Sequence, residues 1–149
     1  MKNYQKKLDD IKKYVKMESE EDMRLFDITA YELAESKDLH IFNQLVGLFD
    51  DDCEYPEIMF SLVHSLETYP KQDYVCGVLQ NAESFSKCPE WYTTLIYGIL
   101  NSETCLEILK NNLHLAKKEH LQEIFDSIYM ESEEHRPIID ELREILNKS

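Results

Sequence analysis

The sequence predicts an all-helical protein, on three observations. Apolar residues recur at spacings of three and four along nearly the whole chain of 149 residues. Gly and Pro are scarce, at 3 and 4 residues. The many tight turns of a β-sandwich need more of these residues than the chain contains. A hydrophobic content of 43% with 31% charged residues is typical of a folded chain. We expect a single all-helical domain over residues 1–149.

Four helices are expected in the first half of the chain. A basic helix covers residues 1–17, and a second follows Ser19 and Asp22, which are placed as N-terminal capping residues. The third runs from about Asp38 to Phe49, and the fourth opens at Pro56, where a missing N–H costs nothing. The expected inward positions are Tyr4, Leu8, Ile11, Val15, Met23, Phe26, Ala30, Leu33, Ile41, Phe42, Leu45, Val46, Phe49, Ile58, Met59, Leu62, Val63 and Leu66.

Five more helices are expected in the second half. Pro70 separates the fourth helix from the fifth, and the polar segment 81–87 precedes a helix that opens at Pro89. Ser102 is expected to cap the next helix, and two amphipathic helices complete the chain. The expected inward positions are Tyr74, Val75, Val78, Leu79, Trp91, Leu95, Ile96, Ile99, Leu100, Leu121, Ile124, Phe125, Ile128, Ile138, Ile139, Leu142, Ile145 and Leu146.

Nine short helices with short polar connections favour antiparallel helical hairpins. Four hairpins over 22–49, 56–82, 89–112 and 118–147 fill residues 22–147, and their starts lie 34, 33 and 29 residues apart. These steps predict a short stack of hairpins, a HEAT-like α-solenoid. No consensus repeats at the level of residues, so an irregular helical bundle is the alternative.

The charge of the chain is strongly negative and uneven. The 30 acidic and 16 basic residues give a net charge of −14. Residues 1–16 carry six Lys against two Asp, which is +4, so residues 17–149 carry 10 bases against 28 acids, which is −18. Such a field repels the phosphates of nucleic acids and anionic lipids and attracts basic proteins. We therefore expect a basic protein partner, with no nucleic acid and no membrane. The alternative is that the acids only keep the protein soluble.

The cell compartment follows from what the sequence lacks. The basic start has no apolar stretch or small-residue cleavage site behind it, and no run of apolar residues reaches membrane-spanning length. Cys53, Cys76, Cys88 and Cys105 show no CxxC spacing, so reduced and mostly buried thiols are expected. These features predict a cytoplasmic protein.

The stretch DDDCEYPE, residues 50–57, was tested as a metal loop and as a helix cap. An EF-hand starting at Asp50 would place Tyr55 where Gly is required and Ser61 where the bidentate Glu is required, so calcium binding is not predicted. One or two acids ahead of Pro56 suit the positive end of the following helix, but four exceed that need. The surplus favours a surface for a cationic partner, with a merely solvated loop as the alternative.

Aromatic residues near these acids are candidate anchors for such a partner. Nine Tyr, six Phe and one Trp are present, with Tyr55, Trp91 and Tyr92 in the middle helices. Aromatic anchors together with steering charges are what an interface for a basic protein needs. The predicted partner-binding residues are Asp50, Asp51, Asp52, Glu54, Tyr55, Glu57, Trp91 and Tyr92. The alternative is that the large aromatic residues belong to the core.

Motifs of catalysis are missing from the sequence. It contains no GxSxG, Walker loop, GxGxxG or HExxH, and no His has a Glu three residues before it. His64 lies in an apolar helix, where we expect a core or groove histidine rather than a base. We predict no enzyme activity, no catalytic residue, no metal and no cofactor.

The segment PEWYTTLIYGILN, residues 89–101, followed by a short helix, resembles the immunity proteins of bacterial polymorphic toxin systems, in particular the family numbered thirty. The likeness covers about residues 20–115 and also includes the acidic, all-helical character of the chain. It implies a protein that binds a cognate toxin domain, often a nuclease, and blocks it inside the producing cell. A helical adaptor for another cellular protein is the alternative. A helical hydrolase around His64 or His120 is a third possibility.

Overall fold

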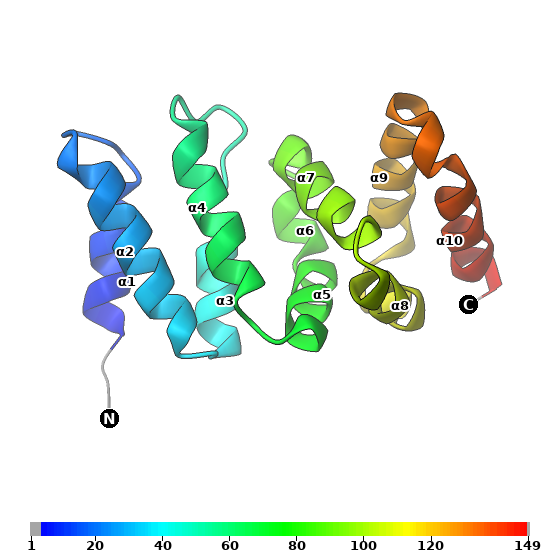
Figure 1. The fold of residues 1–149 in the computed structure, drawn as a ribbon, viewed down its shortest axis with the longest axis horizontal. Helices are drawn as coiled ribbons and strands as arrows, with labels where there is room; N and C mark the ends of the chain where they lie inside the picture. Colours follow the sequence, from blue (N-terminus) through cyan, green and yellow to red (C-terminus); the bar gives the residue numbers. More distant parts are fainter. Residues whose placement is uncertain (1–3, 149) are drawn as a thin grey trace. The chain divides into compact units, whose positions relative to one another are not determined.

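The computed structural model describes residues 4–148, which form ten α-helices and two short 3-10 helices (Figure 1). These residues contain no strand, so the predicted all-α class is confirmed. Residues 1–3, at the start of the predicted 1–17 helix, lie outside the described part. The chain divides into two compact units, with the boundary between Pro70 and Lys71. The single domain and the solenoid remain predictions.

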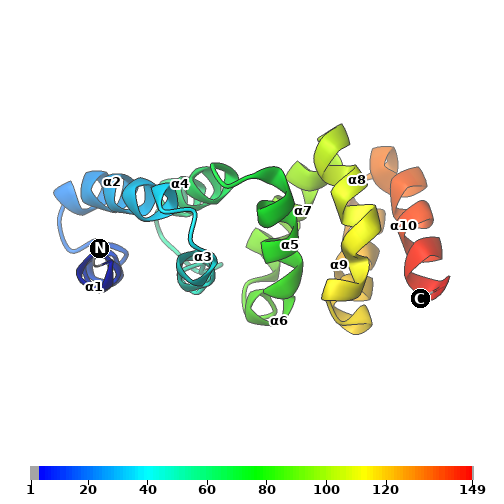
Figure 2. The same cartoon turned by 90° about the horizontal axis from the view of Figure 1, so that it is seen from below.

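Unit 1, the unit that ends at Pro70, has four helices in two layers. They are α1 (Gln5–Tyr14), α2 (Glu21–Glu35), α3 (Leu39–Val46) and α4 (Pro56–Glu67). Figure 2 shows α2 and α4 side by side in one layer, with α1 and α3 beneath them. Nearly all the predicted inward residues of these helices are buried between the layers; Tyr4, Val15 and Met23 are partly exposed. Apolar periodicity was therefore a reliable guide to this core.

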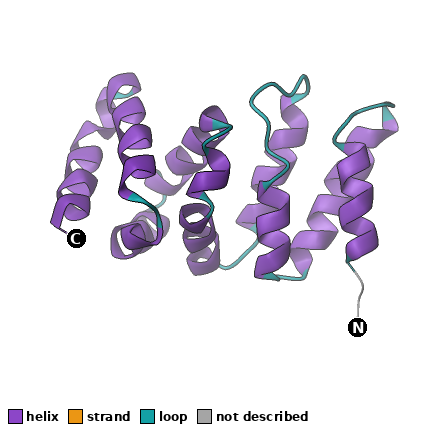
Figure 3. Ribbon diagram, turned by 180° about the vertical axis from the view of Figure 1, so that it is seen from behind, coloured by secondary structure: helices purple, strands orange, loops and turns teal. Residues whose placement is uncertain are grey.

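The ends of the helices in unit 1 are set by local hydrogen bonds. Asp38 caps α3, because its Oδ1 accepts from the backbone N–H groups of His40 at 2.8 Å and Ile41 at 3.2 Å. The N-cap of α2 is Glu20, which makes no side-chain capping bond, so the capping predicted for Ser19 and Asp22 is wrong. Asp22 instead accepts from the N–H groups of Glu18 and Ser19, which lie ahead of the helix. The connections 15–20 and 47–55 lie at the same end of this unit (Figure 3).

Unit 2, the unit from Lys71 onward, holds the other elements. They are α5 (Lys71–Gln80), α6 (Ala82–Phe85), α7 (Pro89–Leu100), α8 (Glu103–Asn112), η1 (Leu113–Leu115), α9 (Lys118–Glu131), η2 (Glu133–His135) and α10 (Arg136–Lys148). Pro89 opens α7 and Ser102 caps α8, both as predicted. The short helix α6 was missed, because one turn is too short to show a period. Its Phe85 is fully buried.

The helices and the cysteines of the described chain bear on two further predictions. No helix within residues 4–148 is long and apolar enough to cross a membrane. All four cysteines are free thiols, but only Cys88 is buried, so the prediction that most of them are buried is wrong.

Candidate functional site

The acidic residues of segment 50–57 are held by the loop itself and by the first turn of α4. Asp50 Oδ1 accepts from the N–H of Asp52 at 2.9 Å, and the Asp50 carbonyl accepts from the N–H of Cys53 at 3.2 Å. The residue before the first turn of α4 is Tyr55, whose side chain makes no capping hydrogen bond. The side-chain bond of Asp50 therefore shapes the loop.

Most of the predicted contact residues of this segment face solvent. Asp50, Asp52, Glu54, Tyr55 and Glu57 are exposed, and Asp51 is partly exposed. Asp50, Asp52, Glu54 and Glu57 form no ion pair with any other residue in the range 4–148. Carboxylates without a cationic neighbour in the same chain are open to lysines or arginines of a partner.

The negative charge is densest in residues 17–70, the part of unit 1 that follows the basic residues 1–16. Residues 17–70 contain 2 bases and 14 acids, a net charge of −12, whereas residues 71–149 contain 8 bases and 14 acids, a net charge of −6. Both bases of the first range are already engaged. Arg24 pairs with Glu21, and Lys37 Nζ donates to Thr68 Oγ1 at 3.1 Å. The acids of residues 17–70 are therefore poorly neutralised by bases of the same segment.

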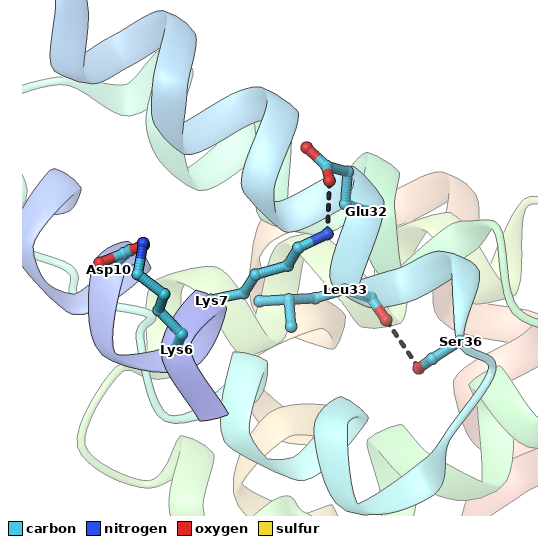
Figure 4. A network of polar contacts seen from close by, with 6 residues as sticks. All are labelled: Lys6, Lys7, Asp10, Glu32, Leu33 and Ser36. Atoms are coloured by element: carbon cyan, nitrogen blue, oxygen red, sulfur yellow. Dashed lines mark hydrogen bonds and ion pairs between the residues drawn. The ribbon is translucent and has the colours of Figure 1, made fainter. Parts of the chain in front are cut away.

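One acid of this unit is neutralised by the basic first helix. Lys7 on α1 donates to Glu32 on α2, and the neighbouring pair Lys6–Asp10 lies within α1 (Figure 4). The hydrogen bond to Glu32 raises the pKa of Lys7 above its usual value, while partial burial acts in the opposite direction. The ion pair connects α1 to α2 and neutralises the charge of Glu32.

The two predicted contact residues on α7 lie in different environments. Trp91 is partly exposed, but Tyr92 is 2% exposed. The Tyr92 ring stacks on Phe85 with centroids 4.7 Å apart, and its hydroxyl donates to the Val78 carbonyl at 3.3 Å. Tyr92 thus belongs to the core of unit 2, as its helical phase with Leu95 and Ile99 explains, and we leave it out of the proposed contact surface. Trp91 and Tyr92 belong to unit 2, whereas the predicted acids belong to unit 1.

A groove between α2 and α4 was not foreseen. It has a volume of about 330 Å³ and is lined by Asp27, Ile28, Tyr31, Glu32, Ser61, His64, Ser65 and Thr68. His64 is exposed, with Nδ1 3.5 Å from Glu67 Oε1, so it is a groove histidine and the core alternative is wrong. Ile28 and Tyr31, apolar residues off the buried stripe of α2, were the signal in the sequence.

The histidine with most polar partners is His135. Its Nδ1 lies 2.6 Å from Ser132 Oγ and its Nε2 lies 2.9 Å from Asn101 Oδ1. The ring is buried and packs edge-on against Tyr97, whose hydroxyl donates to Glu131 Oε2 at 3.1 Å. A neutral imidazole satisfies both contacts, so this network joins the end of α7 to the corner between α9 and α10.

No group of three or more His, Cys, Asp or Glu side chains in the described chain is placed to hold a metal ion. His120, the other histidine considered for catalysis, is partly exposed in a small pocket of about 140 Å³ beside Lys117 and Glu83. The candidate site is therefore the outer surface of unit 1, where exposed acids without ion pairs lie in the same unit as exposed apolar side chains.

An all-α chain with exposed, unpaired acids beside exposed apolar side chains is typical of proteins that act by binding other proteins. The comparison with protein families makes this specific: the chain belongs to the Immunity protein 30 family, which it matches over residues 13–109. The predicted resemblance is confirmed. No curated protein and no solved structure matches the chain. The match runs from within α1 to within α8 and so includes α2, α4 and the acidic loop.

Proposed function

We propose that this protein binds the basic, nuclease-type domain of a cognate toxin and neutralises it by covering its active surface. The single observation that carries the proposal is the net charge of −12 on residues 17–70, most of it exposed. Membership of an immunity protein family supports the choice of a toxin as partner. Binding alone accounts for this activity, which needs no enzymatic step and no cofactor, and we place it in the cytoplasm.

A nuclease is the partner that this charge suits best. Enzymes that bind nucleic acids present Lys and Arg to phosphates, so an acidic protein can occupy the same positive surface. Acids on the blocker also steer the encounter and raise the rate of association. The proposed contact residues are Asp50, Asp51, Asp52, Glu54, Tyr55 and Glu57 in unit 1, together with the partly exposed Trp91 in unit 2.

We expect a toxin gene next to the gene of this protein, and the test is a binding titration with the C-terminal domain of that toxin. We expect one-to-one binding that abolishes cleavage of nucleic acid by the toxin domain. The variant Asp51→Ala/Asp52→Ala/Glu54→Ala should bind at least about tenfold more weakly, because close charge pairs across an interface couple by roughly 1.5 kcal/mol or more. Its melting temperature should barely change, since exposed charges affect stability little.

A matched control separates local contacts from net charge. Glu83→Ala/Glu119→Ala/Glu123→Ala removes the same three charges from exposed positions of unit 2 and should leave the affinity nearly unchanged. Equal affinity of the parent and the loop variant for the toxin domain would show that the loop is not a contact site. An equal loss for both triple variants would reduce its role to net charge, and a parent that does not bind the toxin domain would refute the proposed function.

A further inference from the structure

We propose that the toxin domain docks on the outer face of α2 and α4, seating an apolar side chain flanked by Lys or Arg in the groove between these helices. We call this surface the α2–α4 face and define it by four residues that line the groove, Asp27, Ile28, Tyr31 and His64, and by Phe60, which is exposed one turn before His64 on α4. The inference rests on the proposed function, which it deepens by assigning the apolar centre of the interface. The net charge of residues 17–70 does not by itself indicate this face.

Three apolar side chains of this face remain substantially exposed on unit 1. Helices α2 and α4 lie side by side and bury their other faces against α1 and α3 (Figures 1 and 2). Yet Ile28 is 40% exposed, Tyr31 53% and Phe60 46%. Single exposed apolar residues are common, but three on one face of two adjacent helices mark a surface for binding.

The groove has the shape to take a side chain of a protein. Small residues of α4, Ser61, Ser65 and Thr68, line it opposite the larger Ile28 and Tyr31 of α2. Its volume of about 330 Å³ is at the lower end of the range for small-molecule pockets, and it is shallow rather than enclosed. A depression of this kind suits one or two side chains projecting from a folded partner.

Charge selects the kind of partner. Asp27 lines the groove and forms no ion pair with any described residue, and Glu57 is exposed one turn before Phe60 on α4. The other acid of the groove, Glu32, is already bound by Lys7. A partner with Lys or Arg around its apolar side chain would satisfy Asp27 and Glu57. A second copy of this chain would oppose two surfaces that each carry −12 over residues 17–70, which is repulsive.

The α2–α4 face is continuous with the acidic loop. Glu57 and Tyr55 join the loop to the first turn of α4, and Phe60 follows on the next turn. Apolar anchors at the centre with charged residues at the rim are the usual anatomy of a protein interface. The loop then steers the toxin domain, and the α2–α4 face holds it.

The experiment compares dissociation constants of the full chain for the cognate toxin domain. Tyr31→Ala/Phe60→Ala should weaken binding by roughly 30-fold or more, as expected for loss of anchor residues. The control Leu39→Ala/Met130→Ala removes apolar side chains that are 51% and 76% exposed on α3 and α9, and should change affinity less than about threefold. Asp27→Lys removes no packing and should weaken binding by charge reversal even if the double variant folds poorly.

Three outcomes would overturn the inference. If the parent binds the toxin domain and both groove variants bind equally well, the α2–α4 face is not the docking site, although the proposed function stands. If the parent dimerises and Tyr31→Ala/Phe60→Ala dissolves the dimer without affecting toxin binding, the face belongs to a second copy. If the parent does not bind the toxin domain at all, the proposed function fails and this inference fails with it.

Discussion

Tyr92 shows how burial decides what a single side chain can do. Its ring stacks on Phe85 and its hydroxyl donates to the Val78 carbonyl, so a residue that the sequence offers as an anchor works instead within unit 2. Burial raises the pKa of Tyr92 well above its usual value, because the core disfavours the phenolate. The folded state therefore holds this proton more tightly than the unfolded chain does.

This difference predicts a loss of stability in alkali. In the unfolded chain Tyr92 loses its proton near pH 10, whereas in the folded protein it keeps it. The contribution to stability is thus full below about pH 10 and falls as the pH rises further. Urea unfolding of Tyr92→Phe should show a weaker decline between about pH 9 and 11.5 than the parent, with the exposed Tyr31→Phe as control. Identical declines for the parent and Tyr92→Phe would contradict this account.

Among the elements, α3 depends most clearly on its cap. It has only 8 residues, Leu39–Val46, and Asp38 satisfies two of the N–H groups at its start. The backbone carbonyl of Asp38 also accepts from the Tyr69 hydroxyl at 2.7 Å, which links α3 to the end of α4. A short helix gains little stability by itself, so its cap and its packing must hold it.

Replacing the cap tests this directly. Asp38→Ala should lower the free energy of unfolding by roughly 0.5–2 kcal/mol, whereas Asp38→Asn should keep most of it. The bond from Tyr69 remains in both variants, since it ends on the backbone. Chemical denaturation gives the measurement, and Asp27→Ala, at an exposed position within α2, is the control. A loss for Asp38→Asn as large as for Asp38→Ala would point to charge rather than capping.

For the whole molecule, the uneven charge is proposed to guide the encounter with the partner. The acids of residues 17–70 act together at low salt, where the Debye length is about 30 Å, but only at short range at physiological salt, where it is about 8 Å. On the proposed function, this field accelerates the encounter with a basic toxin domain, while the α2–α4 face governs how long the complex lasts.

We therefore expect the association rate to fall by about tenfold or more between 0.01 M and 0.15 M salt. The dissociation rate should change much less. Stopped-flow mixing with the toxin domain measures both, and the loop variant Asp51→Ala/Asp52→Ala/Glu54→Ala should show a shallower dependence. An association rate that does not change with salt would show that charge does not accelerate the binding of the toxin domain.

The sequence by itself determined most of the helices, most of the core and the family. Helical periodicity and the prolines at positions 56 and 89 are local signals, so they located the helices and their buried stripes. Tyr55 and the acids of the loop were predicted to be exposed contact residues, and their exposure agrees with that prediction. Their binding role stays a prediction.

Only the tertiary structure decided which residues meet across helices. The contact of His135 with Asn101 joins residues 34 apart, and the α2–α4 groove joins Tyr31 to His64 across 33 positions. A periodic pattern says which side of a helix is buried, but the partner of that helix and the register of their contact depend on packing. Trp91 and Tyr92 differ in burial because adjacent helical residues point about 100° apart, and Tyr92 is the one that packs against Phe85 in the core.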